Sequence, residues 1–213
     1  MEAPSLDGQR RLVIEILHDL RNRLNVVVLE AQDLRERTGD RLDEKELAGL
    51  QTAIQQMAER FKQIRESAEP SPTTLVRIPA NELDELALAG LRKEFPRAAW
   101  EIGALDGQAE IDLQQFPLAL RALLQNAMES GEEARVSITA AKDALTIVIS
   151  NPAAAPPVSL EKWGKTFHFS TKRGHLGFGC FYAAEVLRQH GGRIEWSHDA
   201  AAKTVSARVQ VPR

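Results

Sequence analysis

Disulfides, membrane spans and an excess of one charge are all absent from this 213-residue sequence. The single cysteine, Cys180, excludes an internal disulfide framework and favours a reducing compartment, so we expect a cytoplasmic protein. No apolar run approaches the roughly 20 residues of a membrane span, and the polar N-terminus does not resemble a signal peptide. The 27 Lys and Arg residues nearly balance the 30 Asp and Glu residues, for a net charge of −3. This balance argues against a nucleic-acid partner and against direct membrane contact.

The first third of the chain carries two apolar seams with heptad spacing, which predict two long helices. The first seam comprises Val13, Leu17, Leu20, Leu24, Val27, Ala31 and Leu34, and the second comprises Leu47, Leu50, Ile54, Met57, Phe61, Ile64 and Ala68. The Thr-Gly-Asp sequence at residues 38–40 interrupts the pattern between them. We therefore predict a helical hairpin over residues 1–69.

A single hairpin cannot bury the apolar faces of both of its helices. Two copies can do so by pairing into a four-helix bundle, so the seams predict a homodimer. A hairpin packed against the rest of its own chain is the alternative. Pro70 and Pro72 then stop the second helix and favour extended chain, which predicts a linker over residues 70–75.

Residues 76–213 have the mixed pattern of an α+β domain. We expect three helices, at about 81–95, 116–129 and 182–190, the last of which ends at two glycines. Segments rich in apolar and β-branched residues predict strands at 75–78, 100–102, 135–139, 144–150, 193–197 and 204–211.

His18 stands beside the first seam and is therefore expected to face solvent, next to Asp19. The carboxylate of Asp19 could accept a proton from the imidazole or orient it, which would leave the other ring nitrogen nucleophilic. Asn22 follows one helical turn later on the same face, where its amide could hold a water molecule against a phosphoryl group. Taken alone, the segment is more simply explained by a solvated surface histidine.

Two further segments carry groups suited to a phosphate ligand. Asn126, on the helix predicted at 116–129, could present its side-chain oxygen to a magnesium ion that bridges phosphates. The segment from Ser170 to Gly179 combines Lys172 and Arg173 with glycines and leads into a helix. Glycines let the backbone approach a ligand closely, and free N–H groups at a helix start attract phosphate. Taken alone, Asn126 is more simply explained as an ordinary helix amide, and a lone glycine-rich loop is weak evidence, because such loops often merely turn.

In this order, the three segments resemble the motifs of sensor histidine kinases, across nearly the whole chain. His18 to Leu24 resembles the H-box, in which an acid follows the phosphate-accepting histidine and Asn or Thr stands four residues on. Leu123 to Glu129 resembles the N-box. Phe167 to Gly179, followed by Glu185 to Gly192, is similar to the F-box, the G2-box and the helix that ends in His-Gly-Gly.

The resemblance implies a fold and a mechanism. Residues 1–69 would be the dimerisation and phosphotransfer domain, and residues 76–213 a GHKL-type ATP-binding α/β sandwich, with a mixed sheet and helices on one face. ATP would be bound by Asn126, Asn151, Thr171, Lys172, Gly174, Gly177 and Gly179, and Asn126 would also be the ligand of Mg²⁺. His18 would attack the γ-phosphate, and the phosphoryl group would pass to an aspartate of a response-regulator receiver domain. Asn22 would support dephosphorylation of that receiver.

The segment aligned with the G1-box departs from the family pattern. In place of Asp-x-Gly-x-Gly the chain has Asn151-Pro152-Ala153-Ala154-Ala155. An Asn can still accept a hydrogen bond from the adenine amine, but without the strength that a charge adds. The peptide-quorum-sensing branch of the family resembles this arrangement, with Asn at the same position.

The altered G1-box leaves a second interpretation open. The chain could be an ATP-independent histidine phosphotransferase that relays phosphate between receiver domains through His18. A third interpretation is a dimeric scaffold or pseudokinase without chemistry. His18 with Asp19 and Asn22 argues against the scaffold, which needs none of these residues.

Overall fold

The computed structural model describes residues 20, 24, 26–29, 49, 52–57, 71–131, 133–141, 143–154, 159–160, 163–165 and 179–213. The chain divides into two compact units, Met1–Glu69 and Pro70–Arg213. In the first unit every described residue is helical. The remainder of the predicted hairpin lies outside the described residues, and so do His18, Asp19 and Asn22. The hairpin and the four-helix bundle therefore stay predictions.

The second unit is built around a five-stranded mixed sheet with the strand order β2-β4-β5-β7-β6. Its strands are β2 (Ala99–Ile102), β4 (Arg135–Ala140), β5 (Ala144–Pro152), β6 (Arg193–Asp199) and β7 (Thr204–Pro212). Strand β2 runs parallel to β4, and every other pairing in the sheet is antiparallel.

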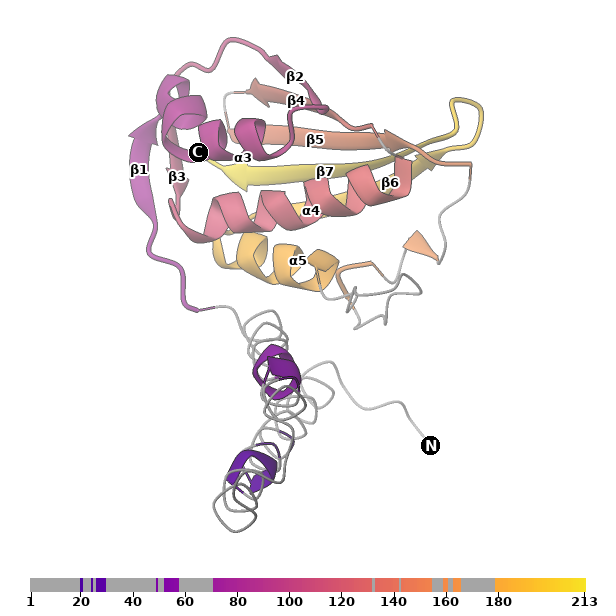
Figure 1. Cartoon of the computed structure of the whole chain (residues 1–213). Helices are drawn as coiled ribbons and strands as arrows, with labels where there is room; N and C mark the ends of the chain where they lie inside the picture. The colour runs from indigo at the N-terminus through magenta and orange to yellow at the C-terminus, as the bar shows by residue number, and fades with distance from the viewer. Residues whose placement is uncertain are drawn as a thin grey trace, which may run out of the picture. The chain divides into compact units, whose positions relative to one another are not determined.

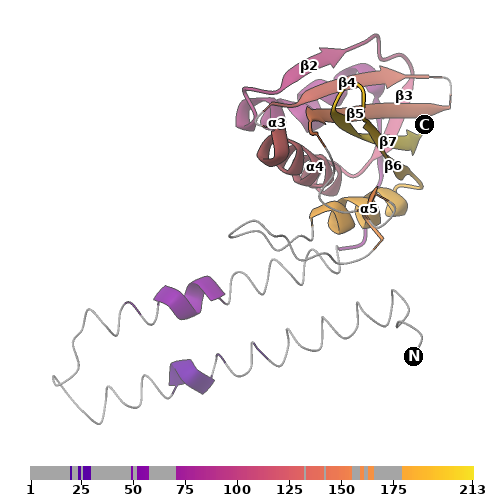
Figure 2. The same ribbon diagram turned by 90° about the vertical axis from the view of Figure 1, so that its right-hand side faces the viewer.

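Three helices cover one face of this sheet: α3 (Ala89–Glu94), α4 (Gln115–Gly131) and α5 (Gly179–Gln189) (Figures 1 and 2). Alternate residues of β5 are buried, because successive side chains of a strand point to opposite faces. From α4, the side chains of Phe116, Leu120, Leu123 and Leu124 pack into the same core. The predicted α+β fold, with a mixed sheet and helices on one face, is confirmed.

The structure differs from the sequence prediction at two elements. A further strand, β3 (Gln108–Ile111), pairs antiparallel with β1 (Val76–Pro79) in a small second sheet. Its four residues contain only two buried apolar side chains, too few to show a strand pattern in the sequence. The helix expected from Asn81 begins at Ala80 and runs to Glu94 as a 3₁₀ turn, a π-helical turn and then α3. Asn81 does not cap it.

Asp112 connects the start of α4 with the end of α5. Its Oδ1 atom accepts hydrogen bonds from the backbone N–H groups of Gln114 and Gln115, both at 2.8 Å, as an N-cap residue does. Its own N–H donates to Nε2 of His190 at 2.9 Å, and Nδ1 of that ring lies 2.8 Å from the carbonyl oxygen of Val186. Both Asp112 and His190 are buried, so the ends of the two helices are joined by satisfied polar groups.

The backbone that precedes β1 is held by the same helix ends. The N–H of Thr74 donates to Oδ2 of Asp112 at 2.6 Å, and the N–H of Thr73 donates to Oε1 of Gln189 at 2.9 Å. Thr73 and Thr74 lie in the predicted linker, residues 70–75. These two residues are therefore attached to the second unit by their own backbone.

Candidate nucleotide site

Helix α4 carries or contacts each of the three predicted nucleotide-site residues that the structure describes. Asn126 belongs to α4 and is half-buried. Gly179, the first residue of α5, packs against Ala122, one helical turn before Asn126: a Cβ added to Gly179 would lie 3.5 Å from the Cβ of Ala122. Asn151, near the end of β5, lies against Gly131, the last residue of α4. The C-terminal half of α4 thus brings the N-box, the G1 segment and the end of the glycine-rich segment together.

Asn151 is a buried polar residue at the end of an apolar column. The side chains of Leu145, Ile147 and Ile149 point to the same, helix-covered face of β5, and Asn151 continues this series with 6% of its surface exposed. Its Nδ2 atom donates to the carbonyl oxygen of Pro152 at 3.0 Å. Within the described part of the chain, no donor is bonded to its Oδ1 atom. The amide therefore offers an acceptor at this end of the sheet.

The described start of the G1 segment, from Asn151 to Ala153, continues along strand β7. Asn151 pairs with Val205 and Pro152 with Thr204 in the ladder with β7. The N–H of Ala153 then donates to the carbonyl oxygen of Lys203 at 2.7 Å, and the carbonyl oxygen of Ala153 lies 3.3 Å from Nε2 of His198. This backbone is extended and bonded on both sides, a conformation that does not require the glycine expected by the family pattern.

A turn at residues 163–165 packs over α5 and β6. The indole rings of Trp163 and Trp196 meet edge to face, with centroids 4.9 Å apart at 74°. Gly164 has a φ of +71°, and a Cβ at this position would lie 2.9 Å from the Cβ of Ala184 on α5. Glycine is thus required here by both backbone conformation and space. In the sequence, only the Trp163-Gly164 pair could have drawn attention to this turn.

Cys180 stands in the first turn of α5, where a helix N-terminus can lower the pKa of a thiol. Burial has the larger effect and raises the pKa of the Cys180 thiol to about 12. The side chain therefore stays protonated at neutral pH and packs as a small, weakly polar residue.

Thr171, Lys172, Gly174 and Gly177 lie outside the described residues. The described ranges contain no group of three or more His, Cys, Asp or Glu side chains that could hold a metal ion. Mg²⁺ bound with a nucleotide needs no such group, because phosphate oxygens and water molecules fill most of its coordination positions. A single amide oxygen on α4, that of Asn126, fits this requirement.

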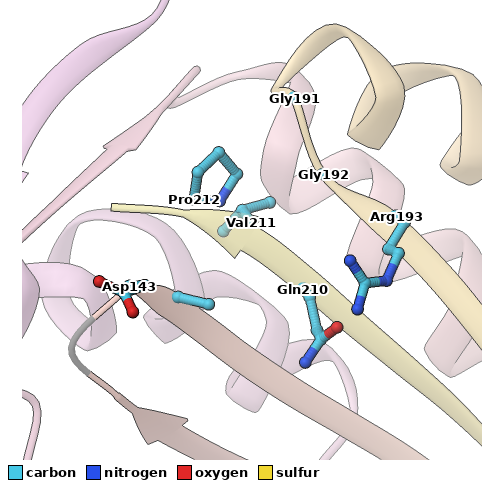
Figure 3. A pocket seen from close by; sticks show the side chains of 8 residues that line it. Asp143, Gly191, Gly192, Arg193, Gln210, Val211 and Pro212 are labelled. Atoms are coloured by element: carbon cyan, nitrogen blue, oxygen red, sulfur yellow. The ribbon is translucent and has the colours of Figure 1, made fainter.

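A shallow depression of about 310 Å³ lies at the far end of β5 (Figure 3). It is lined by Asp143, Ala144, Gly191, Gly192, Arg193, Gln210, Val211 and Pro212. Ala144 is the first residue of β5, whereas Asn151 is the last but one. The depression contains none of the predicted site residues and is separate from the candidate nucleotide site.

The fold of the second unit is that of histidine kinase catalytic domains. The catalytic domain of the histidine kinase ThkA is 20% identical to this chain and covers 66% of it and 98% of its own length, with a TM-score of 0.52. The match with full-length ShkA in complex with AMPPNP covers 95% of this chain and 45% of the ShkA chain, at 15% identity and a TM-score of 0.60. The match with the structure of ThkA in complex with the response regulator TrrA covers 95% of this chain and 64% of the matched chain, at 18% identity and a TM-score of 0.58. No family model matches the chain.

In sequence, the chain is similar to the sensor histidine kinase GtrS of Pseudomonas aeruginosa, at 29% identity over 200 residues. The match covers 89% of this chain and 39% of GtrS, so the chain spans well under half the length of that relative. The resemblance to sensor histidine kinases is confirmed by sequence and by fold. None of the described helices has the length and hydrophobicity that a membrane span requires.

Proposed function

We propose that this chain is the core of a two-component histidine kinase, which uses ATP to phosphorylate His18 and passes the phosphoryl group to a receiver aspartate. One observation carries the proposal: in a domain with the histidine kinase fold, helix α4 carries Asn126, contacts the start of α5 through Ala122 and contacts Asn151 through Gly131. The similarity to GtrS, to ShkA with AMPPNP and to ThkA with TrrA supports it.

Each residue of the proposed nucleotide site has a separate task. The Oδ1 atom of Asn151 accepts a hydrogen bond from the adenine amine. Asn126 supplies an oxygen ligand to Mg²⁺, which neutralises charge on the triphosphate. Thr171, Lys172 and the glycines at 174, 177 and 179 cover the phosphates, close to the N-terminus of α5.

In the phosphoryl transfer, a ring nitrogen of His18 bonds to the γ-phosphorus while the bond to the bridging oxygen of ADP breaks. Asp19 orients the imidazole and accepts the proton from its other nitrogen. The receiver carboxylate then takes the phosphoryl group from His18. The protein's contribution is positioning and charge stabilisation, which is why the spacing of the site residues matters more than their individual reactivity.

The radioactive label from γ-labelled ATP tests this proposal directly. Purified protein with Mg²⁺ should take up label that is stable in base and lost in acid, as expected of a phosphohistidine. The His18→Ala variant should take up none, and its unchanged thermal unfolding would show that the loss is chemical. Label that persists in His18→Ala would overturn the assignment of the acceptor.

A second candidate function, the ATP-independent phosphotransferase, is favoured by the loss of the G1 acid and glycines at residues 151–155. It predicts neither label from ATP nor nucleotide binding. It also predicts that a phosphorylated receiver domain transfers label to wild-type protein and not to His18→Ala. The same two proteins therefore distinguish the candidates.

The proposed role of Asn22 is tested by receiver dephosphorylation. Asn22→Ala should incorporate label from ATP at the wild-type rate and release it from a phosphorylated receiver at least about tenfold more slowly, because the attacking water loses its partner. Asn25→Ala, three residues away, is the matched control and should behave as wild type. Equal dephosphorylation rates in both variants would remove the role from Asn22.

A further inference from the structure

The amide of Asn151 is held in one orientation by the segment around it. Its Nδ2 atom donates to the carbonyl oxygen of Pro152, so the nitrogen faces the strand end and Oδ1 is the atom left for a ligand. A free Asn side chain can rotate by half a turn and exchange donor for acceptor. One of the two N–H groups of Asn151 is committed to Pro152, which fixes the amide plane with Oδ1 on the opposite side, so a ligand on that side meets an acceptor.

Gly131 lies directly against both atoms of this hydrogen bond. A Cβ added to Gly131 would lie 2.7 Å from the carbonyl oxygen of Pro152 and 3.1 Å from Nδ2 of Asn151. The first distance is shorter than real Cβ contacts, and it involves backbone of the five-stranded sheet, which cannot move as a side-chain end can. Any side chain at residue 131 must therefore displace the end of α4, or the Pro152 carbonyl, or both.

We infer that Gly131 is a positioning residue that keeps Asn151 in its acceptor orientation and so makes the site specific for adenine over 6-oxopurines. The inference rests on the proposed function, since it assigns the base-reading role to Asn151. Adenine carries an amino group at the position where hypoxanthine and guanine carry an oxygen. The locked Oδ1 accepts from the amino group and repels the oxygen, whereas a rotating amide accommodates both.

Binding of ATP and of inosine triphosphate (ITP), each with Mg²⁺, tests the inference by titration calorimetry. Wild type should prefer ATP by about tenfold, the value of one good hydrogen bond. Gly131→Ala should reduce the preference to about threefold or less, mainly through tighter ITP binding, with ATP affinity changed less than about twofold. A merely structural role would weaken both nucleotides equally.

Gly90→Ala is the matched control, because a Cβ at this helical glycine meets nothing within 4 Å. It makes the same Gly→Ala change on a helix without the close contact and should leave the preference unchanged. Asn151→Ala should abolish the preference, and Gly131→Ala added to it should change nothing further, as expected when one residue acts through the other.

If the wild type prefers ATP and Gly131→Ala keeps this preference, the inference is overturned and the proposed function stands. Wild type that binds neither nucleotide would overturn the proposed function, and the inference with it. If Gly131→Ala does not fold, wild-type NMR decides: ATP and not ITP should shift the side-chain amide resonances of Asn151 and the backbone amide of Gly131 together. A Gly131 resonance that stays fixed while Asn151 responds would overturn the inference.

Discussion

At the scale of single residues, Asp112 illustrates how one carboxylate can stabilise several parts of a fold. Its two oxygens accept three backbone N–H groups, and its own N–H is bonded to the ring of His190. Burial alone would raise the pKa of Asp112. The backbone hydrogen bonds from Gln115, Thr74 and Gln114, with a smaller contribution from His190, outweigh it, and the pKa lies below its usual value.

This lowered pKa makes a pH-dependent contribution to the stability of the fold. Because the folded pKa is below the unfolded value of about 3.9, the contribution is present above that value and is lost as the pH falls through the folded pKa. Asp112→Asn should lower the free energy of unfolding at pH 7 by about 1–2 kcal/mol, through weaker capping and weaker bonds to the backbone. The difference from wild type should shrink below the folded pKa.

Urea unfolding at pH 7, 4 and 2.5 measures this difference. The exposed Asp106 supplies a control of the same chemistry, and Asp106→Asn should be close to wild type at each pH. A difference between Asp112→Asn and wild type that is constant with pH would contradict the linkage to this carboxylate.

At the scale of elements, helix α4 was the most predictable part of the second unit. Its apolar residues recur at helical spacing, so residues 116–129 were expected to be helical, and the helix spans Gln115–Gly131. Strands such as β5 were predicted from their apolar and β-branched composition, and alternate residues of β5 are buried. Strand β3 was missed, because its four residues are ordered by pairing with β1 and not by a pattern of their own.

The candidate site was predictable only in part. Motif spacing identified Asn126, Asn151 and Gly179, and all three prove to be connected through α4. The contact of Gly131 with Asn151 was not predictable, since it depends on how closely the end of α4 approaches the end of β5. Gly164 was missed for the same reason: the space it leaves is filled by Ala184, which is distant in sequence. A periodic pattern predicts which face is buried but not the distance between two elements.

At the scale of the whole molecule, the described part of the first unit has exposed apolar residues in its predicted seams. Leu20, Val27 and Met57 are 37%, 43% and 46% exposed, while Ile54 is buried. Pairing of two copies would cover these side chains, which supports the predicted homodimer. Light scattering with size exclusion should give twice the chain mass of 23.6 kDa.

Val27→Asp should shift this mass towards the monomer, because a charge in the paired seam would be buried without a partner. Leu86, which is 44% exposed in the second unit, offers a matched control, and Leu86→Asp should remain dimeric. A wild-type monomer at micromolar concentration would favour a hairpin packed against its own chain.

The attachment of Thr73 and Thr74 to the ends of α4 and α5 also moves the start of the fixed backbone of the second unit ahead of its first strand. Strand β1 begins only at Val76, yet the N–H groups of Thr73 and Thr74 are already bonded to Gln189 and Asp112. The edge of the unit is therefore defined by hydrogen bonds and not by secondary structure, and an excised second unit would need these residues to keep the Asp112 carboxylate fully bonded.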